Sequence, residues 1–289
     1  MNWRDYQRPK SVSEALTLLE QAEGKGRVIA GGTDLVLQLR QGRYKADLLV
    51  DITGIEDLQH IEEHENWIHI GAAVTHAEVA KHHLIRKEAN ALAQGCAQVG
   101  SPQIRQMATL VGNIISAQPA ADGAIPLMAL EAEIKVASVA GERWIPLKDA
   151  YRGRELSAVD ATHEITVAVR FKKLGGKGLT GFFRLARRKA LALPTMNGAV
   201  AILRDASGCR LQKARIALGP VAEEPFRPQK AEAYLESQDI SREIILEAAR
   251  IASEEANPRT SLLRGSDDYR KEMIRLYLSR TLCEILAIP

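Results

Sequence analysis

The stretch that decides the fold reads Val28-Ile29-Ala30-Gly31-Gly32-Thr33-Asp34-Leu35. Its apolar start is typical of a short buried strand, the paired glycines end that strand, and Leu35 to Leu39 has helical character. Without a Cβ, the glycines allow backbone N–H groups to approach a phosphate closely, and a helix N-terminus adds donors and partial positive charge. Alternatively, this is a tight strand–helix turn in which Thr33 or Asp34 caps the helix. Both interpretations predict a strand, a loop and a helix in that order.

Strand and helix signals alternate on both sides of this loop. Capping boxes begin at Ser11 and Thr75, and the second precedes helical periodicity from residue 84 to 99. Further strands are expected at 48–52, 67–72, 134–137, 165–171, 182–185, 199–203 and 214–218, and further helices at 126–130, 229–236, 242–255 and 268–286. The mixture predicts an α+β protein with a first domain at 1–175, a linker at 176–181 and a C-terminal domain at 182–289.

The proposed linker contains a dinucleotide-binding pattern that we interpret differently. Gly176 to Gly181 matches G-x-G-x-x-G. However, Phe182 to Leu185 reads as a strand, whereas the fingerprint requires a helix at that point. We therefore expect a flexible connection here.

A second glycine-containing segment lies in the stretch 100–122, which we expect to be irregular and therefore functional. Thr109-Leu110-Val111-Gly112-Asn113 sits among polar residues of little charge, which suits a large polar ligand, although Gly112-Asn113 is also a turn signal. Asp122 ends the stretch. Its carboxylate can accept a hydrogen bond from a ribose hydroxyl, or it can cap the helix that follows.

Composition limits the function. The 39 basic and 36 acidic residues are too balanced to indicate nucleic-acid binding. Three dispersed cysteines cannot hold an iron–sulfur cluster, which needs about four thiolates. The seven histidines lack metal-binding spacing, so we expect them to be solvated or capping. The N-terminus has no signal region, and the longest apolar stretch is interrupted by Pro194. We expect a soluble, cytoplasmic chain with no membrane span and no metal.

Together the two glycine segments resemble those of the flavoprotein subunits of the xanthine dehydrogenase and carbon monoxide dehydrogenase family. That family carries A-G-G-T-D-L near residue 30, as in Ala30 to Leu35. It also carries S-P-Q-I-R-N-x-A-T-I-G-G-N, similar to Ser101 to Asn113, and then a small-residue run that ends in Asp, as at Asp122. Phe183 to Lys189 resembles its F-x-x-x-x-R-R segment, and Arg264 to Arg270 resembles its R-G-S-x-x-Y-R tail.

This resemblance, which runs from about residue 3 to 287, implies a noncovalent FAD held between two subdomains of the vanillyl-alcohol-oxidase (PCMH) type, followed by a small α+β domain. It implies that 27–34 and the N–H groups of Gly31 and Gly32 cradle the pyrophosphate, that 109–113 forms a second wall, that Asp122 binds sugar hydroxyls, and that Ile165 or Thr166 covers a ring. Arg184 falls where some relatives have Lys. The full expected FAD-binding set is Arg27, Val28, Ile29, Ala30, Gly31, Gly32, Thr33, Asp34, Leu35, Val99, Gly100, Thr109, Leu110, Val111, Gly112, Asn113, Asp122, Ile165 and Arg184.

Three positions depart from the family pattern. Val111 replaces a usual glycine and Gln106 a usual Asn. Val99 falls where animal xanthine oxidoreductases place an aromatic residue against the flavin. We therefore expect the second loop to follow a different course, and the resemblance makes no prediction of how NAD would stack.

The resemblance also implies a relay. A large molybdopterin subunit hydroxylates the substrate, and a small subunit with two [2Fe–2S] clusters passes electrons to the FAD and on to NAD, a quinone or another acceptor. Catalytic residues are therefore not expected in this chain. The segment 188–192 resembles purine- and nicotinate-oxidising relatives, which indicates an N-heterocyclic substrate. The alternatives are a self-contained FAD-dependent oxidase of the wider fold family, or a module whose flavin site is vestigial.

Overall fold

A computed structural model describes residues 3–188, 191–261 and 264–289. The chain separates into two compact units, each assembled from segments far apart in sequence. Unit 1 comprises Met1–Val79, Pro102–Ala117 and Glu131–Lys172, and unit 2 comprises Ala80–Ser101, Gln118–Leu130 and Lys173–Pro289. The domain division expected from the sequence cuts the chain at a single linker, and it stays a prediction.

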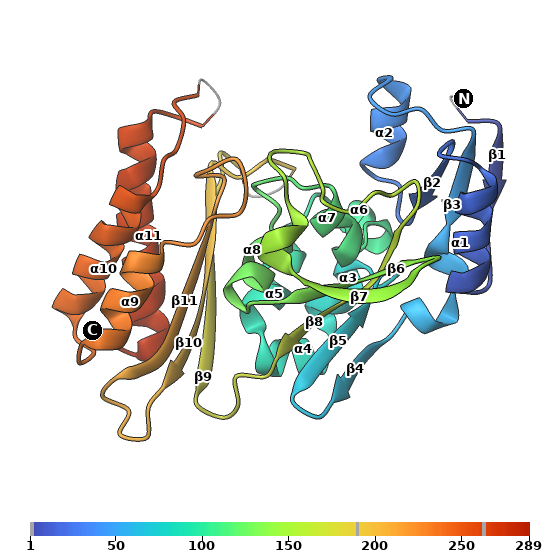
Figure 1. Cartoon of the computed structure of the whole chain (residues 1–289). Helices are drawn as coiled ribbons and strands as arrows, with labels where there is room; N and C mark the ends of the chain where they lie inside the picture. The colour runs from blue at the N-terminus through green and yellow to red at the C-terminus, as the bar shows by residue number, and fades with distance from the viewer. Residues whose placement is uncertain (1–2, 189–190, 262–263) are drawn as a thin grey trace. The chain divides into compact units, whose positions relative to one another are not determined.

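Unit 1 contains a small parallel sheet in the order β1-β3-β2, formed by β1 (Asp5–Gln7), β3 (Leu48–Asp51) and β2 (Gly26–Ile29). Helix α1 (Val12–Gln21) begins at Ser11, whose side chain accepts a hydrogen bond from the Glu14 N–H, so the first capping box is confirmed. Helix α2 (Leu35–Arg40) follows the glycine loop, and Figure 1 shows it above β2. The expected strand–loop–helix order is confirmed.

The larger sheet of unit 1 is antiparallel, in the order β4-β5-β8-β6-β7. Its strands are β4 (Ile61–His64), β5 (Trp67–Gly71), β8 (Ile165–Lys172), β6 (Glu133–Ser138) and β7 (Gly141–Pro146). Short 3-10 turns lie at Ile52–Gly54, Glu56–Leu58 and Leu147–Ala150. On one face the guanidinium of Arg170 lies over the rings of Trp67 and Trp144, at 4.2 and 3.7 Å from their centroids. On the other face the three central strands present buried apolar side chains, such as Ile70, Val169 and Ile134.

Two expectations about helices were wrong. The stretch 100–122 contains helices α6 (Pro102–Met107) and α7 (Leu110–Ile115), which are too short to give a clear periodicity. The periodic stretch 84–99 forms two helices, α4 (His83–Glu88) and α5 (Asn90–Gln98), because Ala89 adopts φ −148° and ψ 55° and breaks the turn. Helix α3 (His76–Lys81) follows the second capping box, which is confirmed by reciprocal hydrogen bonds between Thr75 and Glu78.

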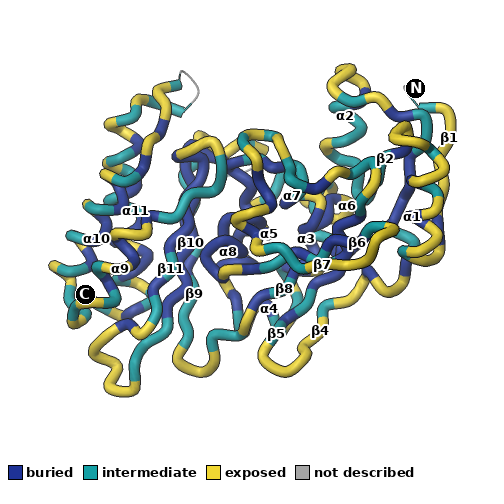
Figure 2. The backbone as a smooth tube through the Cα atoms, in the orientation of Figure 1, coloured by how far each residue is buried: buried dark blue, intermediate teal, exposed yellow. Residues whose placement is uncertain are grey.

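Unit 2 is built on an antiparallel sheet in the order β11-β10-β9, formed by β11 (Leu211–Gly219), β10 (Met196–Arg204) and β9 (Gly178–Leu185). Helices α9 (Gln229–Ser237), α10 (Arg242–Glu255) and α11 (Asp267–Leu286) lie on one side of it, and α5 and α8 (Ala124–Ala129) on the other (Figure 1). With both faces covered, β10 is buried along most of its length, as Figure 2 shows.

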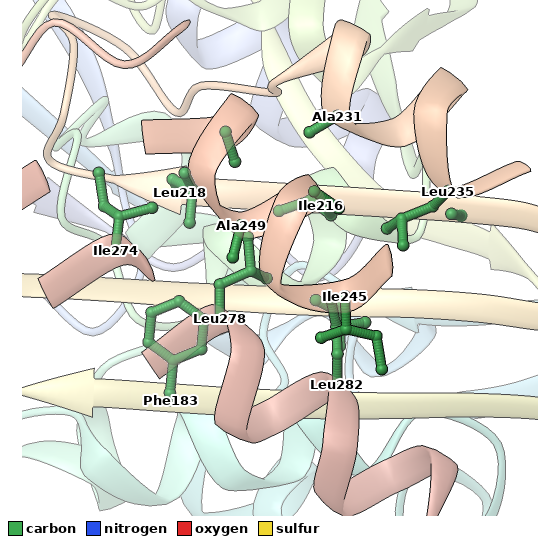
Figure 3. Packing of buried hydrophobic residues seen from close by; sticks show 14 of the residues in the cluster. Phe183, Ile216, Leu218, Ala231, Leu235, Ile245, Ala249, Ile274, Leu278 and Leu282 are labelled. Carbon is green, nitrogen blue, oxygen red and sulfur yellow. The ribbon is translucent and has the colours of Figure 1, made fainter. Parts of the chain in front are cut away.

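Aliphatic side chains fill the space between this sheet and its three C-terminal helices. Figure 3 shows Ile216 and Leu218 of β11 packed with Ile245 of α10 and Leu278 of α11. The only aromatic side chain among the buried members of this cluster, within the described residues, is Phe183. The low aromatic content of the chain therefore leaves a core made of Leu, Ile, Val and Ala.

The flexible linker expected at 176–181 was wrong for its last four residues. Gly178 to Gly181 belong to β9 and pair with Leu203 to Val200 of β10. A Cβ on Gly181 would lie 2.6 Å from Cγ2 of Thr281 in α11. This glycine therefore allows a helix to pack closely on the strand, which a sequence pattern does not distinguish from flexibility.

Candidate functional site

The loop between β2 and α2 presents a row of backbone donors. Within the described residues, the N–H groups of Gly31 through Leu35 donate to no acceptor, and the first to donate is that of Val36, to the Gly32 carbonyl at 3.0 Å. Gly32 has φ +67°, which turns the chain between strand and helix. Backbone donors without protein acceptors are compatible with the oxygens of a phosphate or pyrophosphate.

The structure shows why positions 31 and 32 each hold a glycine. A Cβ on Gly31 would lie 2.0 Å from the carbonyl oxygen of Met107, so this glycine allows the loop to approach the chain before α7. A Cβ on Gly32 would point at the side chains of Ile29 and Val36, at 3.1 and 3.3 Å. These contacts do not locate a phosphate, and the expectation that Gly32 leaves room for one stays a prediction. Its missing side chain serves the backbone conformation.

The capping interpretation of this loop is confirmed for the position of Asp34 but not for its side chain. Asp34 occupies the N-cap position of α2, but its side chain makes no capping hydrogen bond. The surrounding protein raises the pKa of its carboxyl by desolvation, although the side chain remains accessible to solvent. Helix α2 has only 6 residues, so its dipole contributes little and the donors of the loop itself matter more.

The second segment, Thr109 to Asn113, is only partly accessible to solvent. Thr109 accepts the Gly112 N–H at its Oγ1, at 3.0 Å, and thereby caps α7. The side chains of Thr109, Leu110 and Val111 are buried, whereas Gly112 is exposed and Asn113 is half-buried. Val111, which departs from the family pattern, therefore points into the core. Contact with a ligand is left to Gly112 and Asn113.

A buried histidine lies beside this segment. The His76 N–H donates to the Ala108 carbonyl at 2.9 Å, and its ring is completely buried, with neither nitrogen partnered within the described residues. Burial, assisted by the charge of Arg105, lowers the pKa of His76 to about 4. The expectation of a solvated histidine was wrong here, and the ring is neutral at physiological pH.

Other expected residues of unit 1 have mixed environments. The Arg27 guanidinium stacks 3.7 Å from the centroid of the Tyr44 ring, and desolvation lowers its pKa. Val28 and Ala30 are half-buried and Ile29 is buried. Ile165 is fully buried in β8, which argues against its covering a ligand ring. Its neighbour Thr166 is on the opposite face of the strand, with a buried hydroxyl that has no partner within the described residues.

In unit 2, Asp122 forms a buried ion pair with Arg184. Nε of Arg184 donates to Oδ2 of Asp122 at 3.0 Å, with 9% and 7% of the two side chains exposed. Nδ2 of Asn197 donates to Oδ1 of Asp122 at 2.7 Å. Burial raises the pKa of Asp122, and Arg184 and Asn197 oppose this. Since Gly123 is the N-cap of α8, Asp122 does not cap that helix.

Sequence reasoning missed Asn197, although one signal for it existed. It is a polar residue inside the apolar strand Met196–Arg204, and it is fully buried. A buried amide without a hydrogen bond would be destabilising, so a polar residue at such a position indicates a specific partner.

The basic run after β9 divides into two kinds of residue. Arg184 is directed inward and also donates from Nη2 to the carbonyl of Ala192. Arg187 and Arg188 are exposed, and Arg188 donates to the carbonyl of Leu191. Lys189 and Ala190, on which the substrate inference partly depends, lie outside the described residues.

Val99 and Gly100 follow α5 in unit 2. Val99 is its C-cap, with ψ 124°, and Gly100 has φ +50°. Both are half-buried. In the described part of the chain, no group of three or more His, Cys, Asp or Glu side chains is arranged to hold a metal ion. No described helix has the length and hydropathy needed to cross a membrane.

Comparison with known proteins assigns both halves of the chain. Residues 2–171 match the family model of the FAD binding domain in molybdopterin dehydrogenase, and residues 181–285 match the CO dehydrogenase flavoprotein C-terminal domain. The nicotinate dehydrogenase FAD-subunit of Eubacterium barkeri is 32% identical and aligns over 96% of this chain and 94% of its own. The xanthine dehydrogenase FAD-binding subunit of Escherichia coli O157:H7 is 27% identical over 99% and 97%.

Solved structures agree. The match to carbon monoxide dehydrogenase from Hydrogenophaga pseudoflava has a TM-score of 0.91 at 27% identity, and covers 99% of this chain and 98% of that one. Quinoline 2-oxidoreductase from Pseudomonas putida 86 matches with a TM-score of 0.88 at 26% identity, and the match covers 99% and 97% of the two chains. The free backbone N–H groups of the Gly31 loop are compatible with the pyrophosphate of FAD. The chain therefore belongs to the molybdenum hydroxylase family, as the FAD-binding medium subunit of an oxidoreductase.

Proposed function

We propose that this chain is an electron relay, which accepts electrons from [2Fe–2S] clusters on a small partner subunit and delivers them to a terminal acceptor. A large partner subunit with molybdopterin would transform the organic substrate. Support comes from the names of its relatives, which include a carbon monoxide dehydrogenase medium chain and a subunit alpha of a dehydrogenase complex. FAD supplies the redox chemistry, and the residues of this chain bind and orient it.

The observation that carries the proposal is the row of free N–H groups from Gly31 to Leu35. We assign this row to the pyrophosphate of a noncovalent FAD, since five successive donors without protein acceptors would otherwise remain unsatisfied or hydrated. Gly112 and Asn113 are the accessible residues of the second segment and are assigned to the same cofactor. Arg27, which Tyr44 holds by stacking, adds positive charge to unit 1.

In unit 2 we assign Val99, Gly100 and the Asp122–Arg184 pair to FAD. The carboxylate already accepts from Arg184 and Asn197, so a sugar hydroxyl would have to use one of its remaining lone pairs. In unit 1 we prefer Thr166 over Ile165 as a contact, because its hydroxyl lacks a partner within the described residues. We retain 1–175 as the FAD-binding domain and 182–289 as the C-terminal domain, in agreement with where the two family matches divide.

The substrate class we propose for the complex is an N-heterocycle. Relatives named for nicotinate, quinoline and xanthine act on such rings, although others are named for carbon monoxide and glyceraldehyde. The terminal acceptor stays open among NAD, a quinone and another oxidant. We also propose a cytoplasmic location for the chain.

The test compares the isolated chain with the assembled complex. Acid precipitation of the isolated chain should release about one free flavin per chain. The isolated chain should show no turnover of N-heterocycles, aldehydes or alcohols with oxygen as acceptor. The complex purified from its native cells through a tag on this chain should contain iron and molybdenum and should oxidise a heterocycle. Steady turnover by the isolated chain would overturn the relay and support a self-contained oxidase, and a flavin-free chain would indicate a vestigial module.

A further inference from the structure

Three neighbouring strands of unit 2 place Arg184, Asn197 and Gly219 in one row. Asn197 of β10 is directly opposite Arg184 of β9 and directly opposite Gly219 of β11. Side chains at directly opposite positions of paired strands project from the same face of a sheet. The segment that covers this face therefore meets a guanidinium, an amide and a glycine without a side chain, in that order.

The segment from Pro119 to Asp122 covers the row. A Cβ on Gly219 would lie 2.3 Å from the carbonyl oxygen of Pro119, and a Cβ on Gly95 of α5 would lie 2.2 Å from the carbonyl oxygen of Asp122. Both neighbours thus contact the backbone of this segment where only glycine fits. The segment is closely packed against α5 and against the sheet, which leaves Asp122 little freedom to move.

Asn197 donates both of its amide hydrogens to this segment. Its Nδ2 donates to Oδ1 of Asp122 at 2.7 Å and to the carbonyl of Ala120 at 3.1 Å. The residue is fully buried in a strand of apolar residues, where Val or Leu would avoid the cost of burying an amide. An amide at this position is explained if fixing Asp122 matters more than apolar packing.

We propose that Asn197 is a positioning residue for flavin binding, which holds Asp122 against Arg184 and so keeps this charged pair fixed for the cofactor. The inference rests on the proposed assignment of the pair to FAD. Asn197 itself need not contact the cofactor. It acts through Asp122, by one hydrogen bond to the carboxylate and one to the backbone two residues before it.

The titratable groups that face Asp122 determine how this role is detected. In the described part of the chain these are Arg184 of β9, which favours the carboxylate, and the Cys96 thiol of α5, whose pKa is raised by burial first and by the Asp122 charge second. A hydrogen bond to a carboxylate stabilises its charged form. Loss of the Asn197 amide therefore makes Asp122 easier to protonate.

The experiment measures the dissociation constant of FAD for the full chain, by fluorescence titration, from acid to alkaline pH. The variants are Asn197→Ala, which removes the amide, and Asn197→Asp, which keeps its shape. Val200→Ala is the matched control, because Val200 is fully buried on the same strand and belongs to the apolar cluster. Circular dichroism and thermal melting monitor folding, and the flavin midpoint potential is recorded wherever FAD remains bound.

The two variants should respond to pH in opposite directions. Asn197→Ala should weaken FAD binding by about tenfold or more, since a hydrogen bond to a charged group is lost, and the weakening should grow as pH falls. In Asn197→Asp two adjacent carboxyls share one proton, so together they carry the same charge as Asp122 and Asn197 do in the unaltered chain. FAD binding should therefore be nearly retained at neutral pH and lost as pH rises and the shared proton leaves. Val200→Ala should lower the melting temperature with an unchanged pH profile.

The outcomes separate this inference from the proposed function. If the unaltered chain binds no FAD, the proposed function fails. If it binds FAD while both Asn197 variants keep its pH profile and midpoint potential, as Val200→Ala does, Asn197 is only structural and the inference is wrong. Should Asn197→Ala fail to fold, the isosteric Asn197→Asp decides alone: weakening toward alkaline pH supports the inference, and an unchanged profile overturns it.

Discussion

The Gly31 loop and the Asp122 cluster are built in different ways. The loop offers backbone N–H groups from five successive residues, Gly31 to Leu35, so its function depends on chain conformation. The cluster brings together Asp122, Arg184 and Asn197 from three separate segments, and it depends on charge and on side-chain identity. A site made from backbone tolerates almost any change that preserves its turn, whereas a site made from paired side chains is sensitive to the loss of any member.

The largest effect is expected at the buried charge. Replacing Arg184 by Met leaves the Asp122 carboxylate without its cation, and breaking a buried pair from one side costs about 3–5 kcal/mol. Chemical denaturation at neutral pH should show this loss, together with weaker FAD binding. Arg250→Met is the control, because Arg250 forms exposed pairs with Glu247 and Glu254 and should be nearly neutral. A loss at Arg184 as small as at Arg250 would contradict the importance of the pair.

In the loop, Gly31→Ala should have the next largest effect. The new Cβ would lie 2.0 Å from the Met107 carbonyl oxygen, and backbone cannot move aside as a flexible side chain can. We expect a loss of about 3 kcal/mol, the upper end for overpacking, together with loss of FAD. Gly176→Ala, where a Cβ meets no atom within 4 Å, should change neither quantity. Full FAD retention by Gly31→Ala would show that the loop does not bind the cofactor.

The two regions should also respond to acid in opposite directions. His76 in unit 1 has a pKa of about 4 against an ordinary 6.5, so it binds fewer protons folded than unfolded, and its contribution to stability is full above pH 6.5 and is lost as pH falls toward 4. The difference corresponds to at most about 3 kcal/mol. Asp122 has a raised pKa, so its contribution is lost as pH rises.

His76→Leu tests this by removing the titrating ring. Its free energy of unfolding should depend less on pH between about pH 6.5 and pH 4 than that of the unaltered chain. Replacing the exposed His60 by Leu should leave that dependence unchanged. The same slope in both variants would show that His76 is not the group that titrates.

The smallest effect is expected at Gly32. Its φ of +67° costs an alanine about 1–2 kcal/mol, and the side chains of Ile29 and Val36 can shift to accept the Cβ. Gly42→Ala is matched to it, with φ +74° and no atom within 4 Å of the Cβ. The two variants should lose similar stability, but only Gly32→Ala should weaken FAD binding. Equal FAD affinity in both would restrict the role of Gly32 to the turn.

Local sequence patterns predicted the elements whose signals lie within a few residues. The capping boxes at Ser11 and Thr75, the strand before Gly31 and helix α10 follow from periodicity and capping chemistry. Prediction failed where a short helix gave too few turns, as in α7, and where a glycine served packing, as at Gly181. In each failure the deciding contact came from a residue distant in sequence or from a single capping side chain.

The sequence by itself determined the family, the glycine loop and the residue types expected at the cofactor, because these depend on local order along the chain. Only the tertiary structure decided which of them are accessible. In the folded chain Leu110, Val111 and Ile165 are buried, and position 31 requires glycine because the carbonyl of Met107 lies against it. The tertiary structure also joined Asp122 to Asn197, a residue 75 positions away. Burial and pairing depend on which distant segments pack together, and no single stretch of sequence carries that information.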